Sequence, residues 1–117
     1  MDVHRGDIVY VDLGAGEETR GHEIYKQRPA VVIQNDIGNE ESATTIIAPT
    51  TSGQSGYPFQ VSVPAATSDF ERDSVVLLDQ IRTVDIAARI SDVFGSLDTR
   101  TMTEIDHAIA VSLGMDR

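Results

Sequence analysis

An arginine stands directly before a proline at the head of an apolar run in "QRPAVVIQND", residues 27–36. Arginine presents a planar fork of donors that fits a phosphate in a bidentate way. Because proline restricts the residue before it to extended backbone, Pro29 gives the side chain of Arg28 a defined direction. The apolar residues that follow predict a buried strand at about 29–35, with Pro29 at its start. Arg28 is therefore a candidate phosphate-binding residue.

Two threonines end the next apolar segment, "ATTIIAPTT", residues 43–51, which predicts a strand that Pro49 stops. A threonine hydroxyl can donate a hydrogen bond to a phosphate oxygen. If this strand pairs with the strand at 29–35 as a hairpin, the start of one lies near the end of the other. That pairing brings Arg28 close to Thr51. The alternative is a surface arginine in a salt bridge and a threonine on a turn.

A second polar cluster lies in "DQIRTVD", residues 79–85, where Gln80, Arg82 and Thr83 interrupt an otherwise apolar stretch. These side chains either bind a polar ligand or line an exposed sheet face with a satisfied ion pair. In "DFERDS" the acidic residues around Arg72 indicate a salt-bridged loop.

Several kinds of chemistry lack their residues. The three histidines, His4, His22 and His107, are far apart and do not have the spacing of metal ligands, and the chain contains no cysteine. No glycine-rich loop with a lysine follows a strand, and no serine elbow is present. We therefore expect neither a metal site nor a cofactor.

The elements that must position these residues are mainly short strands. Alternation and apolar runs predict strands at 7–13, 29–35, 43–51 and 57–63, and one bent or two short strands within 74–85. Residues 14–27 read as a long loop and residues 37–42 as a turn. Apolar residues at spacings of three and four predict a helix of about four turns from Asp98, a plausible N-cap, to Leu113. Five to seven strands and one helix in residues 1–117 indicate a single domain built as a small, strongly bent barrel.

The charge balance is unusual. Nineteen acidic residues oppose nine basic ones, the formal net charge is −10, and Lys26 is the only lysine. Such a surface stays hydrated where salt screens charge, so we expect a halophilic source; the alternative is an ordinary acidic cytosolic protein. A charge of −10 also argues against binding nucleic acid, because phosphates prefer basic surfaces. No apolar run approaches the roughly 20 residues that span a bilayer, and the N-terminus does not read as a signal peptide, so we expect a cytoplasmic protein.

The segments "RGDIVYVDL", "QRPAVVIQNDIGN", "APTT", "FERDSVVLLDQIRTVD" and "SLDTRTMTEIDHAIAVSLG" together resemble the MazF/PemK toxins, the mRNA interferases of toxin–antitoxin pairs. The resemblance covers nearly the whole chain. It implies an SH3-like barrel with a C-terminal helix, a homodimer and a MazE-like antitoxin as partner. It also implies metal-independent, sequence-specific cleavage of single-stranded RNA. The ribose 2′-OH attacks the adjacent phosphate and leaves a 2′,3′-cyclic phosphate and a 5′-OH, so DNA is not cleaved.

The resemblance assigns roles to single residues. The catalytic arginine and threonine of the family fall on Arg28 and Thr51. The residues expected to contact RNA are Glu23, Lys26, Asn35, Asp36, Thr50, Gln80, Arg82 and Thr83. The aromatic residues expected to stack on bases are Tyr25 and Tyr57, and for Phe59 a place in the core is the stronger interpretation. In "GHE" His22 replaces a small hydroxyl residue, either as a catalytic helper or as a solvated loop residue.

Asn35 and Asp36 should read a different nucleotide from the one at Arg28, because seven extended residues span roughly 20 Å. The net charge is reconciled with RNA binding if Arg20, Lys26, Arg28 and Arg82 line the groove. Activity should then persist in molar salt. Two alternatives remain: a non-catalytic poison like the CcdB gyrase inhibitors, and a module that binds RNA or antitoxin without cutting.

Overall fold

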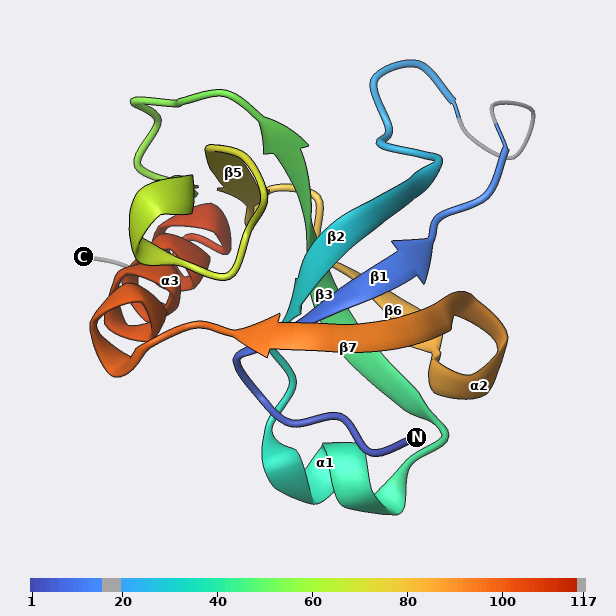
Figure 1. The fold of residues 1–117 in the computed structure, drawn as a ribbon. Coiled ribbons are helices and arrows are strands. Elements are labelled where there is room, and N and C mark those ends of the chain that lie inside the picture. The colour runs from blue at the N-terminus through green and yellow to red at the C-terminus, as the bar shows by residue number, and fades with distance from the viewer. Residues whose placement is uncertain (16–19, 116–117) are drawn as a thin grey trace.

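The computed structural model describes residues 1–15 and 20–115. The strands are β1 (Asp7–Asp12), β2 (Gln27–Val32), β3 (Thr44–Ser52), β4 (Gln60–Val63), β5 (Ser74–Leu77), β6 (Arg82–Asp85) and β7 (Ile90–Ser96). The helices are α1 (Asp36–Glu41), the 3₁₀ turn η2 (Ala65–Thr67), α2 (Ile86–Arg89) and α3 (Thr99–Ser112). Figure 1 shows β1, β2 and β7 in front of β3, with α1 below the sheet and residues 20–26, which lead into β2, above it.

The strands form one antiparallel sheet in the order β4-β5-β3-β2-β1-β7, and β6 pairs with β3 beside β5. This confirms the predicted fold class, mainly β with a C-terminal helix. Within the described residues β4 and β7 end the path, so the sheet curves like a barrel without closing by hydrogen bonds.

Strand β3 runs through Pro49 to Ser52, so the prediction that Pro49 stops it is wrong. The reason lies in a change of partner along one edge of β3. Strand β6 pairs with Thr44–Ile47 and β5 pairs with Thr50–Ser52, which leaves a gap at Ala48 and Pro49 where a missing N–H is tolerated.

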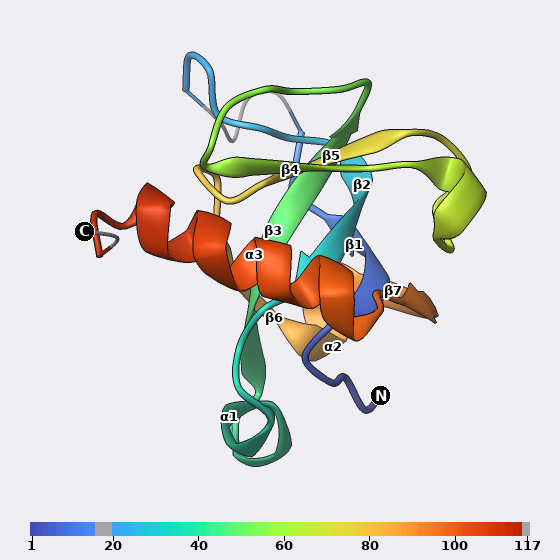
Figure 2. The same ribbon diagram turned by 90° about the vertical axis from the view of Figure 1, so that its left-hand side faces the viewer.

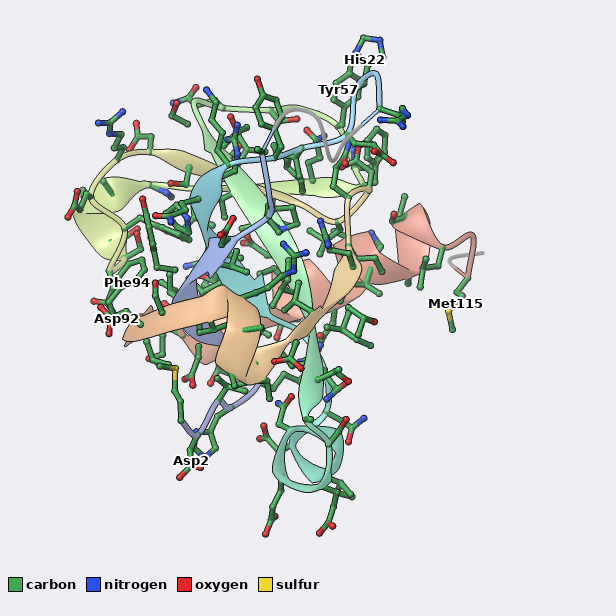
Figure 3. The ribbon with its side chains drawn as sticks, turned by 90° about the vertical axis from the view of Figure 1, so that its right-hand side faces the viewer. Asp2, His22, Tyr57, Asp92, Phe94 and Met115 are labelled. Carbon is green, nitrogen blue, oxygen red and sulfur yellow. The ribbon has the colours of Figure 1, made fainter. Side chains whose placement is uncertain are left out.

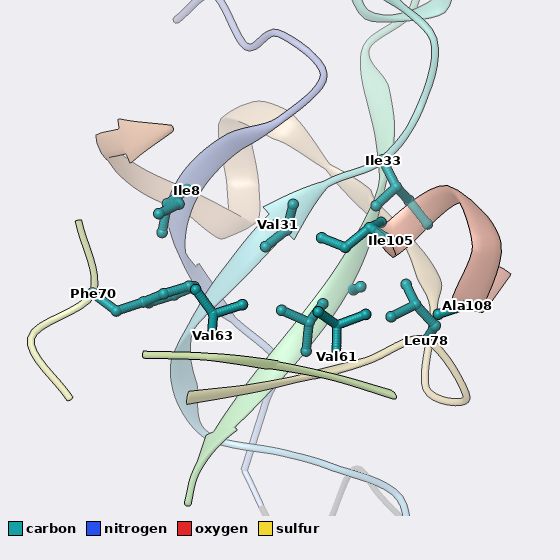
Figure 4. Close-up of a cluster of buried hydrophobic side chains, with 11 residues drawn as sticks. Ile8, Val31, Ile33, Val61, Val63, Phe70, Leu78, Ile105 and Ala108 are labelled. Carbon is teal, nitrogen blue, oxygen red and sulfur yellow. The ribbon is translucent and has the colours of Figure 1, made fainter. Parts of the chain in front are cut away.

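Strands β1 and β2 are buried on both faces where Ile8 and Val9 pair with Val31 and Ala30. Ile8 pairs with Val31 on the face covered by α3, and both lie in the cluster that contains Ile105 of the helix (Figure 4). Their neighbours Val9 and Ala30 pair with each other and belong to the second cluster, on the opposite face. Figure 2 shows α3 crossing the first face of the sheet. Burial on both sides explains why "AVVI" reads as an unbroken apolar run.

The structure adds elements that the sequence interpretation lacks. The segment read as a turn contains α1, which Asn35 caps by accepting a hydrogen bond from the backbone N–H of Gly38. Asn39, buried to 8% exposure, ties α1 to β3 through a 2.6 Å hydrogen bond from the Thr45 hydroxyl. Residues 86–96, without a prediction, form α2 and β7, and Asp85 caps α2 through the N–H of Ala88.

Arg5 joins the N-terminal segment to α1 and α3. Its backbone N–H donates to Asp36, and its guanidinium donates to the Ile33 carbonyl at 2.9 Å and to Asp106 at 2.6 Å. No helix within residues 1–15 and 20–115 is both long and apolar enough to cross a membrane.

Candidate active site

Arg28 and Thr51 come together at the point where β2 and β3 diverge. The two strands pair antiparallel with Ala30 opposite Pro49. Continued by two residues, this register places Arg28 opposite Thr51, as the predicted hairpin requires. Both residues line one groove of about 750 Å³.

The guanidinium of Arg28 is held by two backbone carbonyls. Its Nε donates to the Tyr25 carbonyl at 2.7 Å, and its Nη1 donates to the Thr50 carbonyl at 3.3 Å. Among the described residues Nη2 has no hydrogen-bond partner. Two contacts therefore fix the plane of the fork, while the remaining donors stay available to an anion.

The two adjacent threonines differ in environment. Thr50 is buried to 3% exposure, and its hydroxyl donates to the Pro29 carbonyl at 2.7 Å, which ties β3 to β2. Thr51 is half-buried, lines the groove, and its hydroxyl makes no hydrogen bond with a described residue. Thr51 is therefore free to bind a ligand, whereas Thr50, also predicted to contact RNA, has its hydroxyl engaged inside the fold.

The groove is built from five parts of the chain. Its lining residues are Tyr10 of β1, Lys26–Pro29 at the head of β2, Thr50–Ser52 at the end of β3, Phe70, Glu71, Arg72 and Ser74 before and in β5, and Asp92 and Phe94 of β7. Three are cationic (Lys26, Arg28 and Arg72) and two are acidic (Glu71 and Asp92). A chain with a net charge of −10 thus carries a local excess of positive charge in this groove.

The loop between β1 and β2 is closed at its base beside Arg28. The N–H of Leu13 donates to the carbonyl of Lys26, and the N–H of Lys26 donates to the carbonyl of Gly14, both at 2.9 Å. Lys26 has φ +77°, the only positive φ of a non-glycine residue in the described part of the chain. Such backbone is costly and persists where its surroundings enforce it, often at functional sites. It turns the chain into β2 immediately before Arg28.

Gln80 reaches this loop from the turn between β5 and β6. Its Oε1 accepts from the N–H of Ile24 at 3.4 Å, and its Nε2 donates to the carbonyl of His22 at 3.3 Å. Gln80 does not line the groove and contacts the loop that precedes Arg28. In the same loop the Glu23 carboxylate accepts from the backbone N–H of Arg20. The side chain of His22 is exposed at the loop tip, outside the groove lining (Figure 3).

Besides Glu23 and Gln80, four more of the residues predicted to contact RNA lie outside the groove lining. Asn35 and Asp36 stand at the start of α1, and Arg82 and Thr83 lie in β6, opposite Ile47 and Ile46 of β3. The pKa of Asp36 is lowered, first by the hydrogen bond from the Arg5 backbone and then by that from the Asn39 side chain. That Asn35, Asp36, Arg82 and Thr83 read bases stays a prediction.

The sequence interpretation missed Tyr10, Arg72, Asp92 and Phe94 as groove residues. Arg72 forms no ion pair with a described residue, so the expected salt-bridged loop is absent there. Its acidic neighbours are used elsewhere: Asp73 accepts from the N–H of Ala65, and Asp69 from that of Ser96. In the sequence, only its position as a cation just before a strand could have identified Arg72 as a groove residue. Tyr10 offered only its place in an alternating strand, and Asp92 and Phe94 lay in a strand that was not predicted.

No group of three or more histidine, aspartate or glutamate side chains that could hold a metal ion is found in the described ranges. The groove itself presents an arginine fork and a threonine hydroxyl on adjacent strands. Both are donors suited to the oxygens of a phosphodiester.

Fold and groove together define a small, mainly β protein that holds an arginine fork and a threonine hydroxyl side by side in one groove. The model of the PemK-like, MazF-like toxins of type II toxin–antitoxin systems matches residues 4–113, and the chain belongs to this family. It is 42% identical to the endoribonuclease EndoA of Bacillus subtilis strain 168, over 98% of this chain and 97% of that protein. It is 37% identical to the endoribonuclease MazF of Staphylococcus epidermidis, over 97% and 93%. The crystal structure of MazF from Deinococcus radiodurans superposes with a TM-score of 0.81 at 27% identity, over 98% and 99% of the two chains. These relatives confirm the predicted family and the predicted class of enzyme, an endoribonuclease.

Proposed function

We propose that this toxin cleaves single-stranded RNA, including mRNA, without a metal ion, and that Arg28 and Thr51 are its catalytic residues. The observation that carries the proposal is the meeting of these two donors in one groove, with the Arg28 fork held by the Tyr25 and Thr50 carbonyls. Two relatives that match the chain over nearly its whole length are named endoribonucleases.

In the proposed reaction the ribose 2′-oxygen forms a bond to the adjacent phosphorus, and the bond from phosphorus to the 5′-oxygen breaks. The products are a 2′,3′-cyclic phosphate and a 5′-OH, to which the 2′-OH proton is transferred in the net reaction. Negative charge builds on the non-bridging oxygens in the transition state. Donors already aimed at that charge stabilise it more than they stabilise the ground state.

The two side chains divide this task. Arg28 supplies a full positive charge and free guanidinium donors in a fixed plane. Thr51 supplies a hydroxyl donor to one non-bridging oxygen. Arginine is a poor general base at its ordinary pKa, so its role is electrostatic. DNA lacks the 2′-OH nucleophile and is not a substrate.

The partners of this reaction follow from the family. A toxin of a type II system is neutralised by its cognate antitoxin, and a MazE-like antitoxin with a disordered tail that folds into the groove would block Arg28 and Thr51 together. We also propose a homodimer that acts in the cytoplasm, where mRNA is available.

The test is to incubate the purified chain with a long unstructured RNA in excess EDTA and to map the new 5′-OH ends. Cleavage at a recurring short sequence is expected for the wild type, and loss of cleavage is expected for Arg28→Ala with an unchanged thermal melt. The same assay in molar salt tests whether activity persists there. Toxicity of both proteins to cells without RNA cleavage would instead indicate a non-catalytic poison of the CcdB type.

A further inference from the structure

We infer that Tyr10, Asp92 and Phe94 form a base-binding subsite beside Arg28 and Thr51, selective for bases that carry an exocyclic amino group. The inference rests on the proposed function and names what selects the RNA in that groove. All three residues line the groove that contains the Arg28–Thr51 pair, on the wall made by β1 and β7.

The wall is open to solvent although it contains two aromatic rings. Tyr10 and Phe94 are each 37% exposed, which is unusual for large aromatic side chains next to a core. Among the residues that the structure describes, neither the Tyr10 hydroxyl nor the Asp92 carboxylate makes a hydrogen bond. Tyr10 and Asp92 are direct cross-strand partners, so their side chains start from the same face of the sheet.

A β-bulge places Phe94 in this wall. Ile8 pairs with Gly95 and Val9 pairs with Val93, so Phe94 is an extra residue opposite the step between Ile8 and Val9. Bulges re-aim side chains and are frequent next to active sites. Figure 3 shows Phe94 and Asp92 close together near the end of β7.

The other wall of the groove is fastened to this bulge. Asp69 accepts a hydrogen bond from the N–H of Ser96 at 3.0 Å. A Cβ at Gly95 would stand 2.5 Å from the Cβ of Asp69, so only glycine permits this approach. The hydrogen bond from Ser96 to Asp69 and the close approach at Gly95 set the distance between Phe94 and the segment that carries Arg72. The Arg72 guanidinium has no ion-pair partner among the described residues.

This arrangement fits one unstacked nucleotide. Aromatic faces take up a base by stacking regardless of its identity. Arg72 supplies a cation for the phosphate of that nucleotide. A carboxylate only accepts hydrogen bonds, so Asp92 favours an amino group, as on adenine or cytosine. Uracil presents carbonyl oxygens in place of that amino group and is disfavoured.

The test uses 2′-O-methyl octamers of A, C and U, in which the nucleophile is blocked, so binding is measured without cleavage. Wild type should bind the A and C octamers more tightly than the U octamer. Phe94→Leu, which keeps apolar volume and removes the ring, should weaken binding by about tenfold, whereas Phe94→Tyr should restore it. Asp92→Asn, which adds a donor, should reduce the preference against U.

The control is Leu113→Ala, which removes a large apolar side chain that is 54% exposed, lies at the end of α3 and is outside the groove lining. It should leave affinity and preference unchanged, and thermal melts should show that all variants fold. Wild-type affinity and preference in both Phe94→Leu and Asp92→Asn would overturn the subsite, as would equal losses in Leu113→Ala. Absence of RNA cleavage by the wild type would refute the proposed function alone, because the octamers report binding only.

Discussion

Arg28 of β2 and Thr51 of β3 line one groove, two residues beyond the pair Ala30 and Pro49 with which the pairing of the two strands ends. Thr51 itself pairs on its other side with Val75 of β5. The pair therefore lies where β3 passes from one set of partners to the next, at the margin of the groove. The strands that hold the fold together thus also set the geometry of the two donors, and loop movement is not needed to assemble them.

The substitution Arg28→Lys tests the fork rather than the charge. A lysine keeps the positive charge but cannot hold the Tyr25 and Thr50 carbonyls and still present a planar pair of donors. We expect the rate of cleavage in single-turnover assays to fall roughly 100- to 1,000-fold, the range found when one transition-state donor is lost. A rate within threefold of wild type would show that charge alone is sufficient.

The adjacent threonines provide a matched pair. Thr51→Val should lower the cleavage rate by roughly 100-fold while leaving the free energy of unfolding within about 0.5 kcal/mol. Thr50→Val removes a buried hydrogen bond to the Pro29 carbonyl and should destabilise the fold by about 1–2 kcal/mol. Urea unfolding and single-turnover cleavage of both variants separate the two roles. The reverse pattern would assign the chemistry to Thr50.

The part of the site that depends on local pattern could be predicted from the sequence. The apolar runs around Ala30 and Ile47 fix two strands, and hairpin pairing then brings Arg28 to Thr51 without further information. The second wall could not be predicted, because two bulges in the pairing of β1 with β7 break the period-two pattern that identifies a strand. Exposed Asp92 and Phe94 give that segment no apolar face to recognise.

Helix α1 was missed for a different reason. Its six residues, "DIGNEE", contain a glycine and too few turns to show a helical period. What stabilises it is tertiary: the cap at Asn35, and the contacts of Asn39 with Gln34, Asp36 and Thr45. The contact with Thr45 forms only when β3 packs beside α1, so it cannot be read from the local sequence of the helix. "QND" therefore resembles a ligand-binding cluster in the sequence, while its side chains serve the helix in the structure.

Gln80 should act on RNA through the loop between β1 and β2. Gln80→Ala removes both of its contacts with this loop, at His22 and Ile24. We expect faster hydrogen exchange in a peptide covering residues 20–26 and a several-fold rise in KM with a smaller change in kcat. Gln60→Ala is the control, since Gln60 binds Asp79 beside Gln80 without touching the loop. Unchanged exchange together with an altered cleavage sequence would instead support direct base reading by Gln80.

Asn35 separates a capping role from base reading. Asn35→Ala should destabilise the protein by about 1 kcal/mol, because the N–H of Gly38 loses its acceptor. Asn35→Ser keeps a capping oxygen and removes the amide, so its stability should stay near that of wild type. Mapping the 5′-OH ends produced by Asn35→Ser then tests base reading alone. A changed cleavage sequence supports the predicted contact, and an unchanged one rules it out.

Asp98 makes the stability of α3 dependent on pH. Hydrogen bonds from Thr101, first from its side chain and then from its backbone N–H, lower the pKa of this carboxyl below its ordinary 3.8. Because the folded-state pKa is depressed, the stabilisation is complete above about pH 4 and is lost as pH falls through the folded-state value. Asn at this position caps the helix without titrating.

Thermal melts at pH 7, 5 and 3 should therefore show wild type and Asp98→Asn close together at pH 7 and 5. At pH 3 the melting temperature should have dropped further for wild type than for the variant. Parallel loss of stability in both proteins down to pH 3 would place the acid sensitivity elsewhere, for example at Asp36, whose pKa is also lowered. The helix matters for the site because Ile105 of α3 packs in one cluster with Val31 of β2, the strand that positions Arg28.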